Sequence, residues 1–303
     1  MPLNICLINN FNYSKFLPDC LNSVFSQTKQ FDKVIIVDDG STDSSKSIIS
    51  SYQKSHPNLH ALLQSNDGQL STFNTALPSI NDNSQVFFLD ADDIYPKDYL
   101  ELFQKIIGQN YPDFTYCIPK PFTNDEISKL TTSLVGDFKS EVFYKSTALA
   151  RSRRIWIGNQ TSCLSISSDL YKKIFPYPIP QDFVTKADAV IVHAASILGS
   201  EKIFIPSLQI GYRTHLDNLY FGKVISKEDS RIFTLALDRL FRWYCTKYSI
   251  NESPTIYEFY TELRMLTVKQ RDTLKIPGHL TILKRLIGRR YLWPVLAYAK
   301  KYL

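Results

Sequence analysis

The 303-residue chain has little cysteine, and its five cysteines are scattered without a C-x-x-C pair. An odd number at such spacings argues against a disulfide framework and against a zinc site. The N-terminal residues lack a basic segment followed by a long apolar one, so no secretory signal is predicted. No stretch reaches the roughly 18 apolar residues that a membrane span needs. These absences predict a protein of a reducing cytoplasm, with free cysteines in its core.

Charged residues are not in excess either, since they make up 21% of the chain against 44% hydrophobic residues. These proportions are typical of a globular protein and exclude global disorder. The net charge of +6 arises at the C-terminal end, because residues 269–303 hold nine Lys or Arg and one acid, a balance of +8. The other residues, with 26 basic and 28 acidic side chains, carry −2. The charge therefore gives no reason to expect a nucleic-acid partner.

Short apolar runs alternate with helical spacing through the first 118 residues. Strands are predicted at residues 4–8, 34–37, 59–63, 86–89 and 114–118. Helices are predicted between them, around residues 17–25, 48–52, 70–77 and 99–107. This alternation is typical of an α/β fold with a mostly parallel sheet flanked by helices. In such sheets ligands bind beyond the carboxyl ends of the strands, and the polar clusters of this sequence fall there.

After residue 118 the pattern is weaker. Residues 119–158 are interpreted as an insertion or a lid, and residues 162–167 as a strand. Residues 183–198 have helical spacing, and residues 202–215 are typical of a hairpin or paired strands. From residue 226 onward the chain is predicted to be helical.

One predicted strand ends in three acids, Asp90, Asp92 and Asp93. Residues i and i+2 of an extended strand point the same way, so Asp90 and Asp92 lie on one side. Two carboxylates on one side suit a hard divalent cation, which prefers oxygen ligands. A solvated acidic turn that caps the next helix is the alternative interpretation.

Two further strand ends carry polar segments. The strand at residues 34–37 leads into Asp38, Asp39 and Gly40, where glycine permits a tight turn. A carboxylate at a strand end can accept hydrogen bonds from a nucleobase N–H or a ribose hydroxyl, although turn formation alone also explains these residues. Residues 66–74 follow the third strand and open a helix, whose free backbone N–H groups can face a phosphate.

Together these segments resemble family 2 glycosyltransferases with a GT-A type nucleotide-sugar-binding domain. The resemblance is close over residues 3–115 and looser over residues 155–220. The family's opening motif is matched by Phe11-Asn12 with Leu17, Leu21, Ser23, Val24 and Gln27. Its V-D-D-G-S-T-D segment is matched by Val37 to Asp43, and its D-x-D-D segment by Asp90 to Asp93. Its N-x-G segment is matched by Asn66 and Gly68, with Asn74 at the later Asn position.

The resemblance implies a GT-A type, Rossmann-like sheet with a helical C-terminal extension. Residues 1–118 would form the half that binds the nucleotide-sugar donor. Residues 119–222 would form the acceptor-binding half, with the catalytic base and a lid, and residues 223–303 a helical, basic extension.

The resemblance also implies a role for each matched residue. Asp39 would hold the nucleobase of the donor. Asp90 would contact the ribose or the water shell of the metal, and Asp92 would bind Mn²⁺ or Mg²⁺. The residues implied to bind the nucleotide-sugar are Asn9, Asn12, Asp39, Asn66, Gly68, Asn74, Asp90 and Arg213. The implied metal ligands are Asp90, Asp92 and His215.

An inverting transferase needs a general base that removes a proton from the acceptor hydroxyl. In this family the base is an acid at the head of a helix in the second half, and Asp188 and Asp182 are both candidates. Relatives with a similar late segment have Ala-Asp followed by a helix that ends in glycine, as Asp188 and Gly199 do here. Asp188 is therefore preferred, although it also suits a helix cap or an ion pair with Lys186.

Residues 211–215 resemble the family's Y-R-x-H segment. His215 would be a third metal ligand or a diphosphate contact, and Arg213 would neutralise phosphate charge. A histidine packed at the surface is the alternative for His215. Thr161 and Ser162 are expected to line the acceptor pocket.

The implied activity is metal-dependent, inverting transfer from a nucleoside-diphosphate sugar, with a UDP-sugar as the expected donor. The implied acceptor is a glycan or a lipid-linked glycan in surface polysaccharide biosynthesis. Two alternatives stay open: a non-catalytic nucleotide-sugar- or glycan-binding relative, and a phosphohydrolase with Asp90 as nucleophile. The basic, aromatic tail suits either an anionic membrane surface, on the inner face of the cell membrane, or packing on the domain or a partner subunit.

Overall fold

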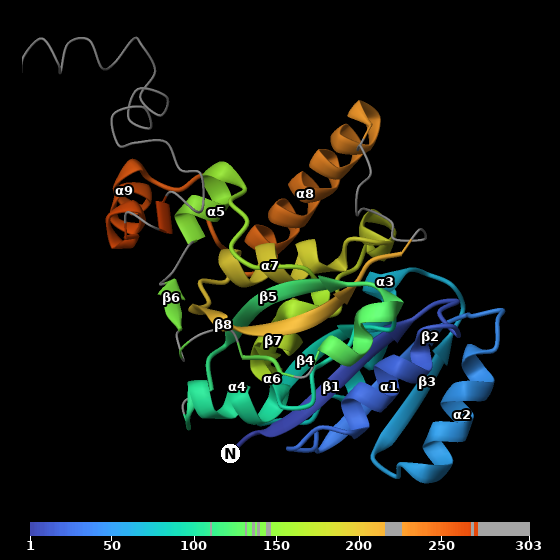
Figure 1. The fold of residues 1–303 in the computed structure, drawn as a ribbon. Coiled ribbons are helices and arrows are strands. Elements are labelled where there is room, and N and C mark those ends of the chain that lie inside the picture. Colours follow the sequence, from blue (N-terminus) through green and yellow to red (C-terminus); the bar gives the residue numbers. More distant parts are fainter. Residues whose placement is uncertain are drawn as a thin grey trace, which may run out of the picture.

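The computed structural model describes residues 1–109, 111–130, 132–134, 137, 140–143, 147–215, 226–267 and 270–271. Within these residues one mixed sheet has the strand order β3-β2-β1-β4-β7-β5-β8-β6 (Figure 1). Its strands are β1 Leu3–Asn10, β2 Lys33–Asp39, β3 Leu59–Gln64, β4 Ser84–Asp90, β5 Phe114–Phe122, β6 Glu141–Phe143, β7 Leu164–Ser167 and β8 Lys202–Arg213.

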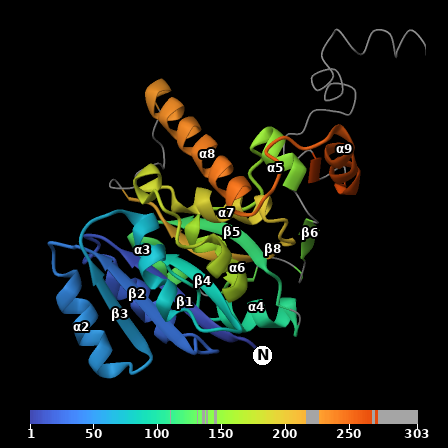
Figure 2. The same ribbon diagram turned by 180° about the vertical axis from the view of Figure 1, so that it is seen from behind.

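Helices cover both faces of this sheet. The α-helices are α1 Leu17–Phe25, α2 Ser45–Ser55, α3 Gln69–Ala76, α4 Tyr99–Ile107, α5 Thr147–Arg153, α6 Ser168–Ile174, α7 Ala187–Ile197, α8 Lys227–Lys247 and α9 Ile256–Met265. Short 3₁₀ turns are η1 Leu77–Ser79, η2 Asn124–Lys129, η3 Thr161–Cys163 and η4 Pro180–Phe183. Helices α1, α2 and α4 lie on one face, and α3, α6 and α7 lie on the other (Figures 1 and 2).

The two hydrophobic layers follow from the apolar runs of the central strands. Successive side chains of a strand point to opposite faces, so a strand buried on both faces needs a continuous apolar run. In β1, Ile5 and Leu7 belong to the layer under α3 and α7, whereas Cys6 and Ile8 belong to the layer under α1 and α4. The prediction of a mostly parallel sheet flanked by helices is confirmed.

The parallel part of the sheet brings four strand ends to one edge. Strands β3, β2, β1 and β4 run parallel, and their register pairs Asn10 with Asp38 and Asn9 with Asp90. The side chains that follow these ends therefore lie beside one another, although up to 80 residues separate them along the chain.

Of the two interpretations of residues 202–215, a hairpin or paired strands, the hairpin is wrong. The structure has one long strand, β8, which pairs in parallel with β5 and antiparallel with β6. The register against β5 shifts between Tyr116 and Ile118, so Phe204 pairs with Tyr116 and Gln209 with Ile118. Pro206, which has no N–H to donate, lies in this irregular stretch. The break in the alternating pattern is therefore a bulge within one strand and not a turn.

The described part of the C-terminal extension is helical, as predicted. Helix α8 buries an apolar stripe that includes Leu240, Phe241 and Tyr244 in the same hydrophobic layer as α7. Helix α9 contacts α5, where the Glu262 carboxylate accepts hydrogen bonds from the backbone N–H groups of Ala148 and Leu149 at 2.9 Å. The predicted membrane-binding or packing tail falls mainly on residues 272–303, which lie outside the described residues.

All five cysteines lie in the described residues, and each is buried and free, as the sequence predicts. Among the described helices, none combines the length and apolar character needed to cross a lipid bilayer.

Candidate active site

A cavity of about 360 Å³ opens at the carboxyl ends of β1, β2 and β4. This is the edge at which a parallel sheet of this kind binds ligands. The predicted site residues that line the cavity are Asn9, Asp39, Asn66, Gly68, Asp90 and Asp92. Segments from four separate parts of the chain therefore meet in one cavity, as the resemblance implied.

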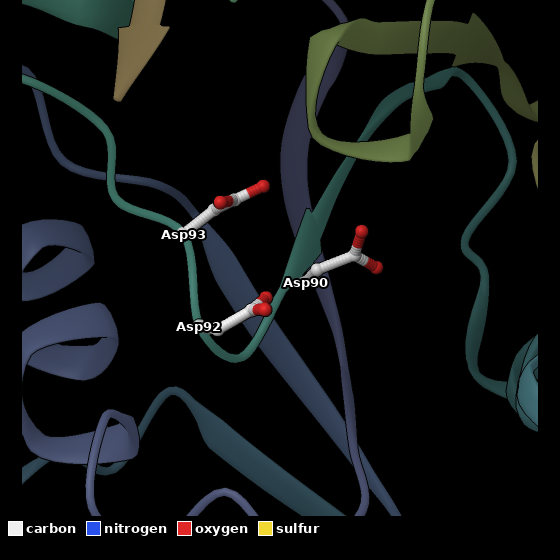
Figure 3. A group of neighbouring side chains, drawn as sticks. All are labelled: Asp90, Asp92 and Asp93. Atoms are coloured by element: carbon white, nitrogen blue, oxygen red, sulfur yellow. The ribbon is translucent and has the colours of Figure 1, made fainter. Parts of the chain in front are cut away.

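At the acidic end of the cavity, Asp90 and Asp92 belong to the lining and Asp93 is buried beside them. One carboxylate oxygen from each of the three lies within 4.8 Å of the others. Asp90 ends β4, the other two stand on the following turn, and all three side chains project to the same side (Figure 3). Burial, then the nearby charge of Asp92, raises the pKa of Asp90 to about 8. Burial, then the nearby charges of Asp92 and Asp90, raises the pKa of Asp93 well above its usual value.

This donor set fits a divalent cation. The carboxylates are partly or fully removed from water and repel one another, so a positive charge among them relieves both penalties. Oxygen ligands at this density suit Mg²⁺ or Mn²⁺. His215 lies beside one of these acids, since its Nε2 is 3.0 Å from Asp92 Oδ2, and its ring packs 4.5 Å from that of Phe16. The structure thus brings the predicted ligands Asp90 and Asp92 together and places His215 next to Asp92, outside the group of three acids.

Asp93 differs from the other two acids because both its oxygens have buried partners. Ser162 Oγ donates to Asp93 Oδ2 at 2.6 Å, and the backbone N–H of Arg213 donates to Oδ1 at 2.9 Å. Ser162 Oγ also accepts from the backbone N–H of Asp90 at 3.0 Å. Ser162 is fully buried beneath the acidic turn, so the structure places it as a support of that turn and not in an acceptor pocket.

The opposite end of the cavity contains Asp39, which is 3% exposed. Its carboxylate accepts hydrogen bonds from Gln64 Nε2 at 2.7 Å and from the backbone N–H groups of Asp67 and Gly68 at 2.9 Å. A carboxylate offers about four acceptor positions, so a further donor such as a nucleobase N–H can still be accommodated. These bonds fix the turn from which α3 begins.

Two predicted nucleotide contacts brace the surrounding loops and lie outside the cavity lining. Asn12, in the left-handed region with φ +55°, accepts a hydrogen bond from the backbone N–H of Thr42 at 2.8 Å. Asn74 donates to the Tyr177 carbonyl and accepts from the Tyr177 N–H, both at 2.9 Å. This amide pair ties α3 to the segment that precedes η4.

Arg213 lies beneath the acidic turn and is only 1% exposed. Its Nε donates to the Asp92 carbonyl at 2.7 Å, and its Nη2 lies 3.1 Å from Asp19 Oδ2. The guanidinium also lies 5.0 Å from the ring of Phe16 and 4.8 Å from that of Phe122. This environment places Arg213 where it orders the loop of Asp92, and not on the wall of the cavity where a phosphate would bind.

The two candidate bases have different environments. Asp182, in η4, accepts two hydrogen bonds from Arg239, at 2.8 Å from Nε and 2.6 Å from Nη2. Asp188, in the first turn of α7, accepts one from the backbone N–H of Ala189 at 2.8 Å. Burial raises the pKa of Asp188 to about 6, and the hydrogen bond from Ala189 and then the charge of Lys186 partly offset the rise. A carboxylate with this pKa is suited to accept a proton near neutral pH.

Gln69 and Tyr212 are among the lining residues that were not assigned from the sequence. Gln69 lines the cavity, and its Nε2 donates to Asp90 Oδ1 at 2.8 Å and to Thr161 Oγ1 at 3.2 Å. Tyr212 also lines the cavity, and burial together with nearby carboxylates, including Asp188, raises its pKa to about 12. Both lie inside segments that the resemblance singled out, at residues 66–74 and 211–215. Their place within these segments was the sequence signal that could have identified them as site residues.

Comparisons with known proteins agree with the geometry. The family model described as "Glycosyl transferase family 2" matches residues 6–175. Over 217 residues the chain is 31% identical to an uncharacterized glycosyltransferase of a Nostoc species, covering 69% of this chain and 64% of that protein. Over 101 residues it is 35% identical to the putative teichuronic acid biosynthesis glycosyltransferase TuaG of Bacillus subtilis, covering 33% and 40%. The chain thus spans less than two thirds of the length of these relatives.

Solved structures share the fold. Staphylococcus aureus TarS 1-349 in complex with UDP-GlcNAc superposes with a TM-score of 0.59 at 17% identity, covering 91% of this chain and 76% of that one. The mannosyltransferase PcManGT of Pyrobaculum calidifontis, in complex with GDP-Man and Mn²⁺, gives 0.51 at 15% identity, covering 96% and 82%. These likenesses confirm the predicted GT-A type fold. Since the family model spans more than half of the sequence, the chain belongs to glycosyl transferase family 2.

Proposed function

We propose that this protein is a metal-dependent, inverting glycosyltransferase that uses a nucleoside-diphosphate sugar, with a UDP-sugar as the expected donor. The acceptor is a hydroxyl of a glycan or a lipid-linked glycan in surface polysaccharide biosynthesis. The observation that carries the proposal is that Asp39 and the acids Asp90 and Asp92 line one and the same cavity. The name of the teichuronic acid relative and the UDP-GlcNAc and GDP-Man bound by the structural neighbours support the classes of acceptor and donor.

The two ends of the cavity suit the two ends of a nucleoside diphosphate. Asp39 offers a carboxylate to a base N–H, and Asn9 lies on the adjacent strand β1. Asp90, Asp92 and His215 would hold Mn²⁺ or Mg²⁺, which when bound neutralises the charge that develops on the leaving diphosphate. Arg213 orders the turn that presents Asp92, and Ser162 fixes the backbone at Asp90.

We assign to Asp188 the role of the general base that removes the proton from the acceptor hydroxyl. Its raised pKa, about 6, makes it a stronger base than an exposed aspartate while leaving it ionised at neutral pH. Asp182 is less suited, because its two oxygens are occupied by the Arg239 guanidinium. Removal of the proton makes the acceptor oxygen a stronger nucleophile. That oxygen would bond to the anomeric carbon of the sugar from the face opposite the diphosphate, whose bond to the same carbon breaks as the nucleoside diphosphate leaves, so the configuration inverts.

The substitution Asp92→Asn tests the cation site, because it removes one charge and one anionic ligand with little change of shape. We expect calorimetry to detect Mn²⁺-dependent UDP binding to the wild-type protein and none to Asp92→Asn. The control is Asp82→Asn, since the Asp82 side chain is 88% exposed and far from the cavity lining. Equal UDP affinity with and without Mn²⁺ in the wild-type protein would overturn the metal role.

A thermal-shift screen identifies the nucleobase of the donor. Bound ligand stabilises the native state by RT ln(1 + [L]/Kd), so UDP, GDP and TDP in the presence of Mn²⁺ should give different shifts. A non-catalytic binding protein would also show these shifts. It would show no sugar transfer, and substitution of Asp188 would leave its nucleotide binding unchanged.

A further inference from the structure

Gln69 stands where the donor-binding and acceptor-binding halves meet. It is the first residue of α3 and directly follows Gly68, whose φ is +90°. Its backbone N–H donates to the Val184 carbonyl at 2.8 Å, so the main chain already joins the two halves here. The side chain lines the cavity beside Asp90.

Both ends of the Gln69 amide are used. Nε2 donates to Asp90 Oδ1 at 2.8 Å and to Thr161 Oγ1 at 3.2 Å. Oε1 accepts from the backbone N–H of Ala187 at 3.2 Å. Ala187 is the first residue of α7, and the helix starts without a side-chain cap from its own N-cap residue, Lys186. Gln69 therefore satisfies one of the free N–H groups of that helix from another element.

We infer that Gln69 is a positioning residue that holds the carboxylate of Asp90 and the start of α7, with Asp188, at a fixed separation. The inference rests on the proposed function, since it assigns Asp90 to the donor and Asp188 to the acceptor hydroxyl. The side-chain amide has the required polarity, with a donor toward the carboxylate and an acceptor toward the helix N–H. A small displacement between the two groups costs a large factor in rate, about 100-fold for 1 Å.

Two substitutions separate the two contacts. Gln69→Met keeps the length of the side chain and removes all three of its hydrogen bonds. Gln69→Glu keeps an acceptor for the Ala187 N–H but turns a second oxygen toward Asp90, which replaces attraction with repulsion. The control is Gln53→Met, because Gln53 is exposed on α2 and distant from the cavity lining.

Hydrogen exchange measures the position of the helix without any need for activity. In Gln69→Met we expect the peptide covering residues 184–190 to exchange about tenfold faster, the factor that corresponds to one hydrogen bond. In Gln69→Glu and Gln53→Met its exchange should match that of the wild type. Unchanged exchange in Gln69→Met would overturn the inference.

Kinetics test the consequence for catalysis. In both Gln69 variants we expect kcat to fall about 100-fold while the donor KM stays within about threefold of the wild-type value. A wild-type kcat in either variant, or a loss confined to KM, would overturn the positioning role. If the wild-type protein transfers no sugar from any donor, the proposed function fails, and exchange at residues 184–190 then decides alone whether Gln69 holds the helix.

Discussion

The substitution Asp188→Asn should stabilise the folded protein while it removes the activity. Asn has nearly the shape of Asp and keeps an oxygen that can accept from the Ala189 N–H, as Asp188 Oδ1 does. The substitution removes a carboxylate that burial keeps from ionising freely. The proposed base is thus a group whose charge the folded state tolerates poorly.

The size of the effect follows from the pKa of Asp188, which rises from 3.8 to about 6 on folding. This rise corresponds to roughly 3 kcal/mol of free energy of unfolding, at 1.36 kcal/mol for each pKa unit. The side chain is only partly buried, so the figure is an upper limit. Because the folded state has the higher pKa, Asp188 contributes its full stability below about pH 4, and that stability is lost as the pH rises through about 6.

Chemical denaturation between pH 4 and pH 8, without nucleotide or cation, measures this difference. Relative to the wild type, Asp188→Asn should gain little stability at pH 4 and about 2–3 kcal/mol above pH 7. Its transfer rate should fall at least about 100-fold while nucleotide binding is retained. The control Asp182→Asn loses the negative charge and one of the two oxygens that accept from Arg239, and should lower stability only slightly, because such exposed pairs contribute little. A stability difference between wild type and Asp188→Asn that does not grow from pH 4 to pH 7 would refute the reasoning.

Three further substitutions test other contacts of the site and its supports. In Gly68→Ala the new Cβ would lie 2.8 Å from Val184 Cα at a positive φ, so we expect a loss of at least about 1 kcal/mol and weaker nucleotide binding, measured by denaturation and calorimetry. Asn74→Ala removes both bonds to Tyr177 and should lower stability by about 1–3 kcal/mol with a nearly unchanged UDP affinity; a selective loss of affinity would restore Asn74 to the nucleotide site. Glu262→Ala uncovers the first N–H groups of α5 and should cost about 1–2 kcal/mol without lowering kcat, and equal melting of variant and wild type would contradict the capping role.

The parallel half of the fold was predictable because its signals are local. Each of its strands is an apolar run, each strand end carries polar residues, and the helices between them have regular spacing. The antiparallel additions were less predictable. Strand β7 was predicted at residues 162–167 in spite of its four residues, whereas α5 and α6 have seven residues each, too few for a periodic pattern to emerge. The bulge of β8 interrupts its alternation, which led to the wrong prediction of a hairpin.

The candidate site likewise has residues that local sequence signals predict and residues whose placement they do not predict. Asp39, Asp90 and Asp92 follow predicted strands, so their convergence could be expected from strand order alone. Whether a matched residue faces the cavity or the loop behind it depends on partners that are remote in sequence. Asn74 turns to Tyr177 and Arg213 to Asp92, and neither contact leaves a signal in the local sequence.

The site gathers groups that the folded protein pays to keep. Burial raises the pKa of Asp90, Asp93 and Asp188, so each of these acids resists ionisation in the absence of ligand. A bound cation would offset the cost at Asp90, and the proton taken from the acceptor would offset it at Asp188. Through one amide, Gln69 contacts Asp90 and the first residue of α7, the helix that bears Asp188. The stability given up at each end of this bridge is what makes the two ends receptive, one to a cation and the other to a proton.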